Sequence, residues 1–412
     1  MSLWNRLLPL AFTIAAAGPV QGQSLGEKDL ALILDRNPQQ AIRFQNAGAA
    51  ELFSPLWYQQ IVNGFRATPV GDGVERENRF TDWQLVGVRV APCMPLGTTP
   101  ADRITEHCWP EVRLVWQPIV NFAPPTGLFA DDRAIHAIYD VFTGDALNQF
   151  EMSRVITLRN RLMNYYHGGR NPANLLQPNE EAEFRALRNK VIDRMIGNTL
   201  WLRTLPNGYA GNGVRPEYFS AQVTEFRGRL LAWLQTYTAP HLIKEVTSFS
   251  LPAGRAPGQI NVWSFIALSG QAGQLQQRSI SIQSAVNGRT LANLGLHETV
   301  TRQQGDVRLL NAPLSPYVVQ ELRNSVIFNA IDRNRLLPRL ADRQQILVAN
   351  TSCASCHRFQ QNGNDFHNMS YFTGSPQISL ADRTQRDVAL DLAWLATHQL
   401  RTLAIRSLEP ES

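Results

Sequence analysis

The chain has 412 residues, of which 44% are hydrophobic and 18% charged, a composition typical of a globular protein too long for one small core. Its formal net charge of +5 comes almost wholly from arginines that are scattered along the chain. Without a basic stripe or a recognition motif, the sequence gives no support to nucleic-acid binding. We therefore expect two or three folded domains that bind no nucleic acid.

The first 22 residues have the features of a secretory signal peptide. Arg6 supplies a positive charge, Leu7–Ala17 is an apolar stretch of eleven residues, and Val20-Gln21-Gly22 occupies the expected cleavage positions. This stretch is too short to span a bilayer, and no other apolar run reaches about eighteen residues. The mature chain is therefore predicted to be periplasmic or secreted and to lack a transmembrane span, with a retained N-terminal anchor as the alternative.

Residues 23–145 are predicted to begin with amphipathic helix and to continue as a strand-rich domain. Apolar residues recur at helical spacing up to about residue 60, in Asp29–Leu34 and in Leu56–Val62. Apolar and polar residues then alternate in three further segments, which predicts half-buried strands. These segments are Trp83–Val90, Glu111–Gln117 and Ala134–Val141.

Two of the four cysteines lie beside the first two predicted strands. Cys93 and Cys108 enclose fourteen residues, and closing a loop of this size would stabilise the fold by about 3 kcal/mol in the chain-entropy model. Free thiols are oxidation liabilities outside the cytoplasm, so a disulfide is favoured over two free cysteines. We expect this bond to be structural.

The middle of the chain changes from helical to strand-like patterning. From about residue 145 to 248 the apolar residues follow a helical period, and the run Glu180, Glu181 and Glu183 near a helix start is expected to be solvated. Alternating residues return between Gln259 and Leu310. The mixed order predicts an α+β fold with a helical region at 146–250 and a strand-rich region at 251–314. The absence of an internal repeat argues against a propeller.

Residues 315–412 are predicted to form a separate helical domain. Ser315-Pro316 is a favourable start for a helix through Ile327, and a second helix is expected near Ala341–Asn350. Ser379–Asp382 resembles a capping box, after which apolar residues recur at helical spacing. The sequence therefore predicts a C-terminal helix that follows Ser379.

The segment Cys353-Ala354-Ser355-Cys356-His357 has the spacing of a covalent haem attachment site. Its two thiols can add to the vinyl groups of one porphyrin, and His357 can then bind the iron as an axial ligand. A thioredoxin-like redox pair would need a βαβ setting that is not visible, and for a zinc site Cys93 and Cys108 are too distant in sequence. A plain disulfide would leave His357 unexplained. The motif therefore predicts one covalently attached haem c.

This motif and the helices predicted around it resemble the c-type cytochromes over roughly the last 75 residues. The resemblance implies an α-helical cytochrome c-like domain whose terminal helix carries Trp394 into the haem crevice; an ordinary core position for this ring is the alternative. It also implies Met369 as the sixth iron ligand, with His367, His398 or an open iron position as alternatives. The stretch between motif and terminal helix is shorter than usual in the family, which leaves the ligand assignment open.

A single covalently held haem is suited to one-electron transfer with a redox partner protein or a small-molecule donor or acceptor. Periplasmic electron transfer by a monohaem cytochrome is therefore the predicted function. The alternatives are a haem enzyme with an open distal iron position and an upstream substrate pocket, and a binding or scaffold protein with structural haem. The remaining histidines are not spaced as metal-binding pairs and are expected to serve structure. They are His107, His136, His167, His241 and His297.

Overall fold

A computed structural model of the chain confirms the predicted α+β class, with helices packed around an antiparallel sheet. None of the helices in the described part of the chain is long and apolar enough to cross a membrane. The residues that the structure describes are 25–34, 41–66, 79–97, 106–121, 128–130, 133–142, 145–204, 214–250, 262–271, 274–284, 305–313, 319–322 and 382–397.

The strands form one ten-stranded sheet in the order β1-β2-β3-β5-β6-β7-β8-β9, with β4 paired to β3 and β10 paired to β7. All of these pairs are antiparallel. The strands are β1 Ala31–Ile33, β2 Trp83–Pro95, β3 Cys108–Asn121, β4 Leu128–Ala130, β5 Arg133–Asp140, β6 Ile243–Ser250, β7 Val262–Gln271, β8 Gln274–Ser284, β9 Gly305–Pro313 and β10 Val319–Leu322.

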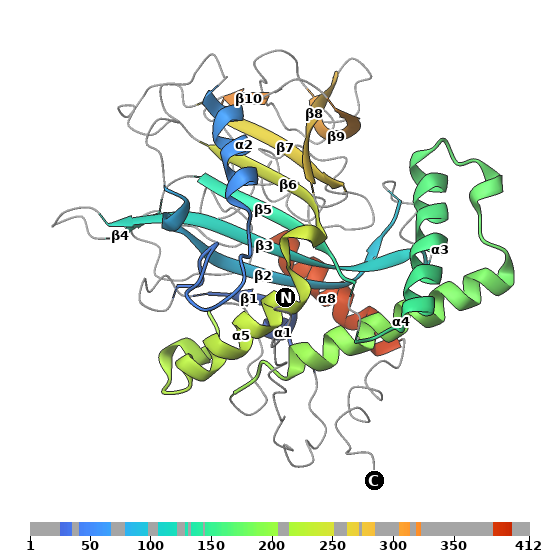
Figure 1. Cartoon of the computed structure of the whole chain (residues 1–412), viewed down its shortest axis with the longest axis horizontal. Coiled ribbons are helices and arrows are strands. Elements are labelled where there is room, and N and C mark those ends of the chain that lie inside the picture. The colour runs from blue at the N-terminus through green and yellow to red at the C-terminus, as the bar shows by residue number, and fades with distance from the viewer. Residues whose placement is uncertain are drawn as a thin grey trace, which may run out of the picture.

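The helices lie on both sides of the sheet and beside it. Figure 1 shows α2 in front of the sheet, α8 behind it, and α3 with α4 at its right-hand end. Helix α8 packs against α1 and β2, whereas α4 packs against α3, β2 and β3. The α-helices are α1 Glu27–Leu30, α2 Pro55–Arg66, α3 Gln149–His167, α4 Pro178–Leu200, α5 Val223–Tyr237 and α8 Asp382–Thr397. Short 3-10 turns are formed by Phe80–Asp82, Pro172–Asn174, Pro216–Phe219 and Pro240–Leu242.

Alternation along β3 gives the sheet two different sides. Val112, Leu114 and Trp116 are fully buried on one side, while Glu111 and Arg113 lie on the other, because successive side chains of a strand point to opposite faces. Both sides are largely covered, since Glu111 is also buried. The strand therefore joins an apolar core to a layer that contains charge.

The apolar side is filled by aromatic rings gathered around Phe44. The centroid of the Phe44 ring lies 4.7 Å from that of Phe53, 4.8 Å from that of Trp116 and 4.9 Å from that of Phe80. Trp83, the first residue of β2, stacks on Phe44 with its ring centroid 5.8 Å away. Contacts of this size and geometry bury large ring surfaces, so this cluster fixes residues 41–61 on the sheet.

Most of the predicted elements are present, including the helix at Leu56–Val62, the three strands of the N-terminal half and the helices between 149 and 237. Strands from the regions 23–145 and 251–314 belong to the same sheet, because β6 pairs with both β5 and β7. Of residues 315–412, only β10 and α8 are described, and the predicted domain boundaries stay predictions.

Three predicted helical segments are strands. Ala31–Ile33 forms β1, and its residues are buried throughout, a pattern that periodicity alone does not separate from a buried helix. Ile243–Ser250, placed in the helical region, is β6 and is paired on both sides. Val319–Leu322, placed in the helix after Ser315, pairs with β7 as β10. In each case at least one pairing partner is distant in sequence, so tertiary contacts override the local signal.

Candidate haem segment and the disulfide cluster near its terminal helix

Nearly all residues predicted to hold the haem lie outside the described part of the chain. They are Cys353, Cys356, His357, Met369, His367 and His398. Trp394 is the exception, and it lies on α8, the predicted C-terminal helix. Within the described residues, no group of three or more His, Cys, Asp or Glu side chains is placed to hold a metal ion.

The buried residues of helix α8 recur at the helical spacing that the sequence indicated. Val388 and Leu395 are completely buried, whereas Ala389 and Ala393 are exposed on the remaining surface. Trp394 is half-buried, and the guanidinium carbon of Arg188 lies 5.5 Å from the centroid of its ring. Trp394 therefore makes a cation–π contact with an arginine of α4, and it also packs against the hydrophobic core.

A buried charge cluster attaches α8 to the sheet. Arg89 Nη1 lies 3.1 Å from Asp387 Oδ2, and Arg89 Nη2 lies 2.7 Å from Asp391 Oδ2. The two aspartates are four residues apart, which places them on one face of the helix. Burial alone would lower the pKa of Arg89, but the two carboxylates outweigh it and raise that pKa above its usual value. The arginine is therefore firmly charged, and α8 supplies its counter-charges.

Cys93 and Cys108 are joined in a disulfide, which confirms the predicted pair. Their Cα atoms lie 5.0 Å apart, in a position where Pro95 of β2 faces Cys108 at the start of β3. The bond thus ties together the ends of two neighbouring strands, as the sequence predicted from the strands on either side of the loop.

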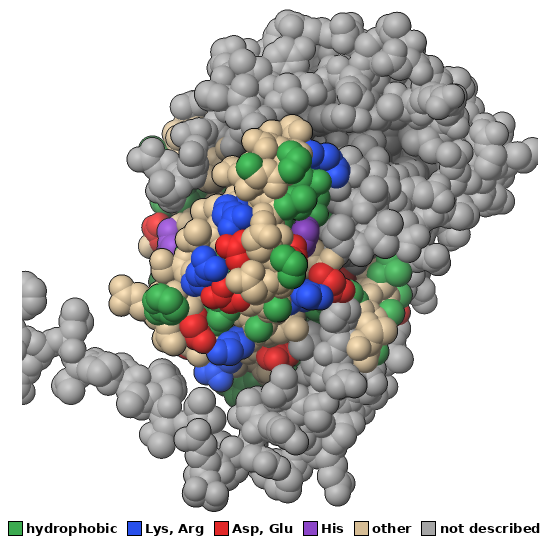
Figure 2. Space-filling model, turned by 90° about the vertical axis from the view of Figure 1, so that its right-hand side faces the viewer, with side chains coloured by type: hydrophobic (Ala, Val, Ile, Leu, Met, Phe, Trp, Pro, Cys, Tyr) green, Lys and Arg blue, Asp and Glu red, His purple; other side chains and the backbone are tan. Residues whose placement is uncertain are grey.

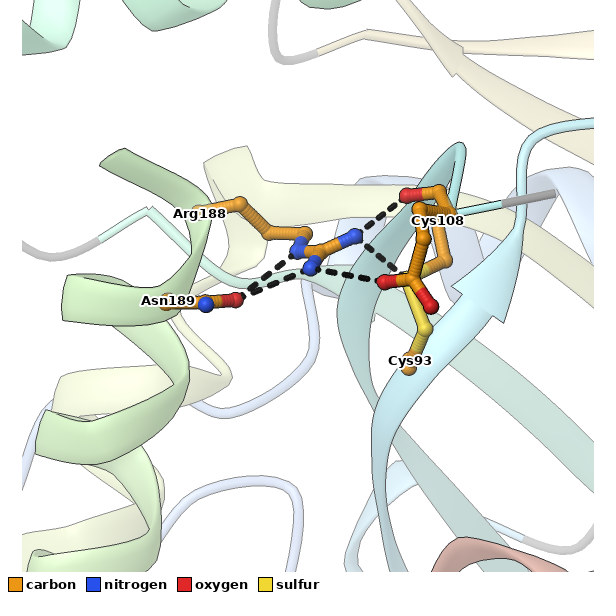
Figure 3. The surroundings of a disulfide bond; sticks show 5 residues. Cys93, Cys108, Arg188 and Asn189 are labelled. Atoms are coloured by element: carbon orange, nitrogen blue, oxygen red, sulfur yellow. Dashed lines mark hydrogen bonds and ion pairs between the residues drawn. A yellow bond between two sulfur atoms is a disulfide. The ribbon is translucent and has the colours of Figure 1, made fainter. Parts of the chain in front are cut away.

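Arg188 of α4 reaches this disulfide from the side, as Figure 3 shows. Its Nη1 donates to Cys108 Sγ at 3.2 Å and to the backbone oxygen of Glu106. Its Nη2 donates to Glu106 Oε2 at 3.2 Å and to Asn189 Oδ1 at 2.9 Å. Burial lowers the pKa of Arg188 below its ordinary value, because the surrounding carboxylates do not fully compensate for the loss of water.

His107 follows Glu106 in the chain and makes hydrogen bonds at both ring nitrogens. Nδ1 lies 2.6 Å from Tyr166 Oη of α3, and Nε2 contacts Glu181 of α4. The expectation of a structurally satisfied histidine is confirmed. The predicted acidic run lies at the start of α4 and is partly exposed, and it also forms ion pairs, Glu180 with Arg161 and Glu181 with His107.

The residues that sequence reasoning missed are Arg89, Asp387, Asp391 and Arg188. Two aspartates four residues apart, beside the buried Val388 and Leu395, were a readable signal for a buried cation. No comparable signal marked Arg188, because its contacts depend on how α4 meets β3.

No known protein family, curated protein or solved structure matches this chain.

Proposed function

We propose that this protein is an exported monohaem c-type cytochrome that transfers electrons in the periplasm or outside the cell. The observation that carries the proposal is Cys353-Ala354-Ser355-Cys356-His357, which occurs once and supplies two thiols and an adjoining imidazole. When bound, the haem would supply one-electron redox chemistry, with His357 as an axial ligand. The electron donor or acceptor would be a redox protein or a small molecule.

Two further features support this assignment. The signal-like residues 1–22 suit a protein whose haem is attached outside the cytoplasm, as the resemblance to c-type cytochromes implies. The Cys93–Cys108 disulfide suits an oxidising compartment, because such bonds are rare in cytosolic proteins. The two features are independent of the haem motif itself.

Covalent attachment is the direct test. Protein produced together with haem-maturation machinery should keep a haem-dependent peroxidase stain on a denaturing gel, because thioether bonds survive denaturation. Cys356→Ala should weaken or abolish this stain. Ser355→Ala is the matched control within the motif, and it should stain normally because Ser355 supplies no bond. An exported, colourless protein with two titratable thiols at Cys353 and Cys356 would contradict the proposal.

The sixth iron ligand distinguishes an electron carrier from an enzyme. If Met369 is the ligand, the ferric protein should show the near-infrared band of sulfur ligation, and Met369→Ala should lower the potential and admit carbon monoxide. If His367 is the ligand, the band should be absent and His367→Ala should open the iron instead. An unaltered protein that binds carbon monoxide rapidly would favour an enzyme with an open distal position.

A further inference from the structure

The Cys93–Cys108 disulfide lies beside a buried positive charge that a purely structural bond does not require. Arg188 Nη1 lies 3.2 Å from Cys108 Sγ, and only 1% of the Arg188 side chain is exposed. A bonded sulfur is a weak acceptor, whereas a thiolate carries a full negative charge and takes a much stronger hydrogen bond from a guanidinium. The contact therefore favours Cys108 as a reduced, ionised thiol more than it favours the disulfide.

Arg188 differs from Arg203, another buried arginine, in its carboxylate partner. Arg203 pairs with Asp29, a carboxylate that is 1% exposed. The Glu106 carboxylate beside Arg188 is 37% exposed and lies 3.2 Å from Nη2. Water screens an exposed carboxylate, so Glu106 balances the charge of Arg188 less completely than Asp29 balances that of Arg203. A thiolate at Cys108 would provide Arg188 with a buried counter-charge.

The two sulfurs of the bond are not equivalent. Both cysteines are buried, but 8% of Cys93 is exposed against 1% of Cys108, so Cys93 is the residue of the pair that an attacking group can approach from solvent. Attack at Cys93 makes Cys108 the leaving group, and exchange is faster when the leaving thiol has a lower pKa. Arg188 therefore contacts the sulfur at which a positive charge assists the reaction.

We propose that Cys93–Cys108 is a redox-active disulfide, opened by a dithiol reductant that attacks Cys93 while Arg188 holds Cys108 as a thiolate. In the first step a thiolate of the dithiol bonds to Cys93 Sγ, and the electron pair of the broken bond leaves on Cys108. In the second step the other thiolate of the dithiol displaces Cys93, which leaves as a thiolate. The dithiol loses two electrons and becomes a disulfide, and the two cysteines gain them. This reaction does not depend on the haem.

The first test replaces Arg188 and follows reduction of the folded holoprotein by dithiothreitol. Alkylation and peptide mapping read Cys93 and Cys108 separately from the haem motif. Relative to the unaltered protein, Arg188→Met should lower both the reduction rate and the equilibrium reduced fraction by about tenfold or more. Arg203→Met is the matched control, because it removes a buried arginine that pairs with Asp29, and it should leave both quantities within about twofold.

Two outcomes of this experiment would overturn the proposal. One is an Arg188→Met protein that is reduced as fast and as fully as the unaltered one. The other is an unaltered protein whose disulfide is reduced only when the whole protein unfolds, so that the reduction rate equals the rate of global unfolding. Circular dichroism of each variant establishes that the comparison is made between folded proteins.

A second measurement leaves Arg188 in place and therefore does not depend on the folding of its variants. Cys93→Ser frees Cys108 as a thiol, and the infrared S–H stretch of that thiol is lost when it ionises. The difference spectrum against Cys93→Ser/Cys108→Ser assigns the band to Cys108. The apparent pKa should lie well below the ordinary value of about 8.5, and a value at or above it would overturn the proposal. Within the described part of the chain, the charged and titratable side chains around this position include Glu106, His107, Glu181, Arg185 and Arg188.

Discussion

Two groups of arginine–carboxylate ion pairs differ greatly in how much of their side chains is exposed to water. Between β2 and α8, Arg89 pairs with Asp387 and Asp391, and no more than 10% of any of these three side chains is exposed. Between α3 and α4, Arg154 pairs with Glu183, and these side chains are 33% and 38% exposed. Figure 2 shows the interspersed charges of this outer face. Water and salt screen the outer group, so stability should depend chiefly on the inner one.

The inner group also offsets the repulsion between two facing arginines of the sheet. Arg89 of β2 faces Arg113 of β3 directly, and like charges in that position destabilise a strand pair. Arg113 pairs with Glu111 at 3.1 Å, and Lys244 of β6 reaches the same carboxylate at 2.7 Å. Arg89 receives its counter-charges from α8. The helix therefore neutralises a charge that the sheet itself leaves unbalanced.

The largest effect is expected when the inner carboxylates lose their charge. Asp387→Asn/Asp391→Asn should lower the free energy of unfolding by about 3–5 kcal/mol, because a buried arginine beside Arg113 is left without counter-charge. Urea denaturation followed by circular dichroism measures this loss. A loss below about 1 kcal/mol would show that these charges do not hold α8 on the sheet.

The control for this prediction also removes Arg89, the cation that the double variant leaves without a counter-charge. Adding Arg89→Met to the double variant should restore much of the lost stability, because replacing a whole buried ion pair by apolar groups is often nearly neutral. If the added substitution lowers stability further, Arg89 contributes through packing instead of charge.

The pH dependence of stability should come from Glu111. Lys244 and Arg113 overcome the effect of burial and lower its pKa from 4.5 to about 2. Because the folded-state value is depressed, the stabilisation is fully present above pH 4.5 and is lost as pH falls toward 2, by about 3 kcal/mol in all. Urea titrations of the unaltered protein and of Glu111→Gln should therefore converge as the pH is lowered through this range. Parallel curves would assign the acid sensitivity to other groups.

The smallest effect is expected at the outer face. Arg154→Ala removes a bidentate contact with Glu183, but both side chains are accessible to water. The change in unfolding free energy should lie near the error of a denaturant titration and should vanish in high salt, which screens exposed pairs. The inner double variant measured under the same conditions should keep most of its effect. A large, salt-resistant loss at Arg154 would remove the distinction between the two groups.

How well each part could be predicted from the sequence depends on how local its cause is. The strand from Trp83 and the helix from Asp382 follow from alternation and helical spacing within a few residues. The short strands β1 and β10 exist because distant strands pair with them, so their own residues carry little signal. The same holds for Arg188, whose contacts with Cys108 and Trp394 join three elements that are far apart in the sequence. The haem motif could be read because its chemistry needs only five consecutive residues.

The attachment of α8 also sets an order of events during synthesis. Arg89 and Asp391 are 302 positions apart, so a chain that leaves the ribosome N-terminus first exposes β2 long before its counter-charges are made. Contacts of such long range slow folding, and partly folded chains expose strand edges that aggregate. Arg89 gains these counter-charges only after α8, the last helix in the described part of the chain, has been synthesised. The Cys353–His357 segment precedes that helix in the sequence, so it is translated before Arg89 gains its counter-charges.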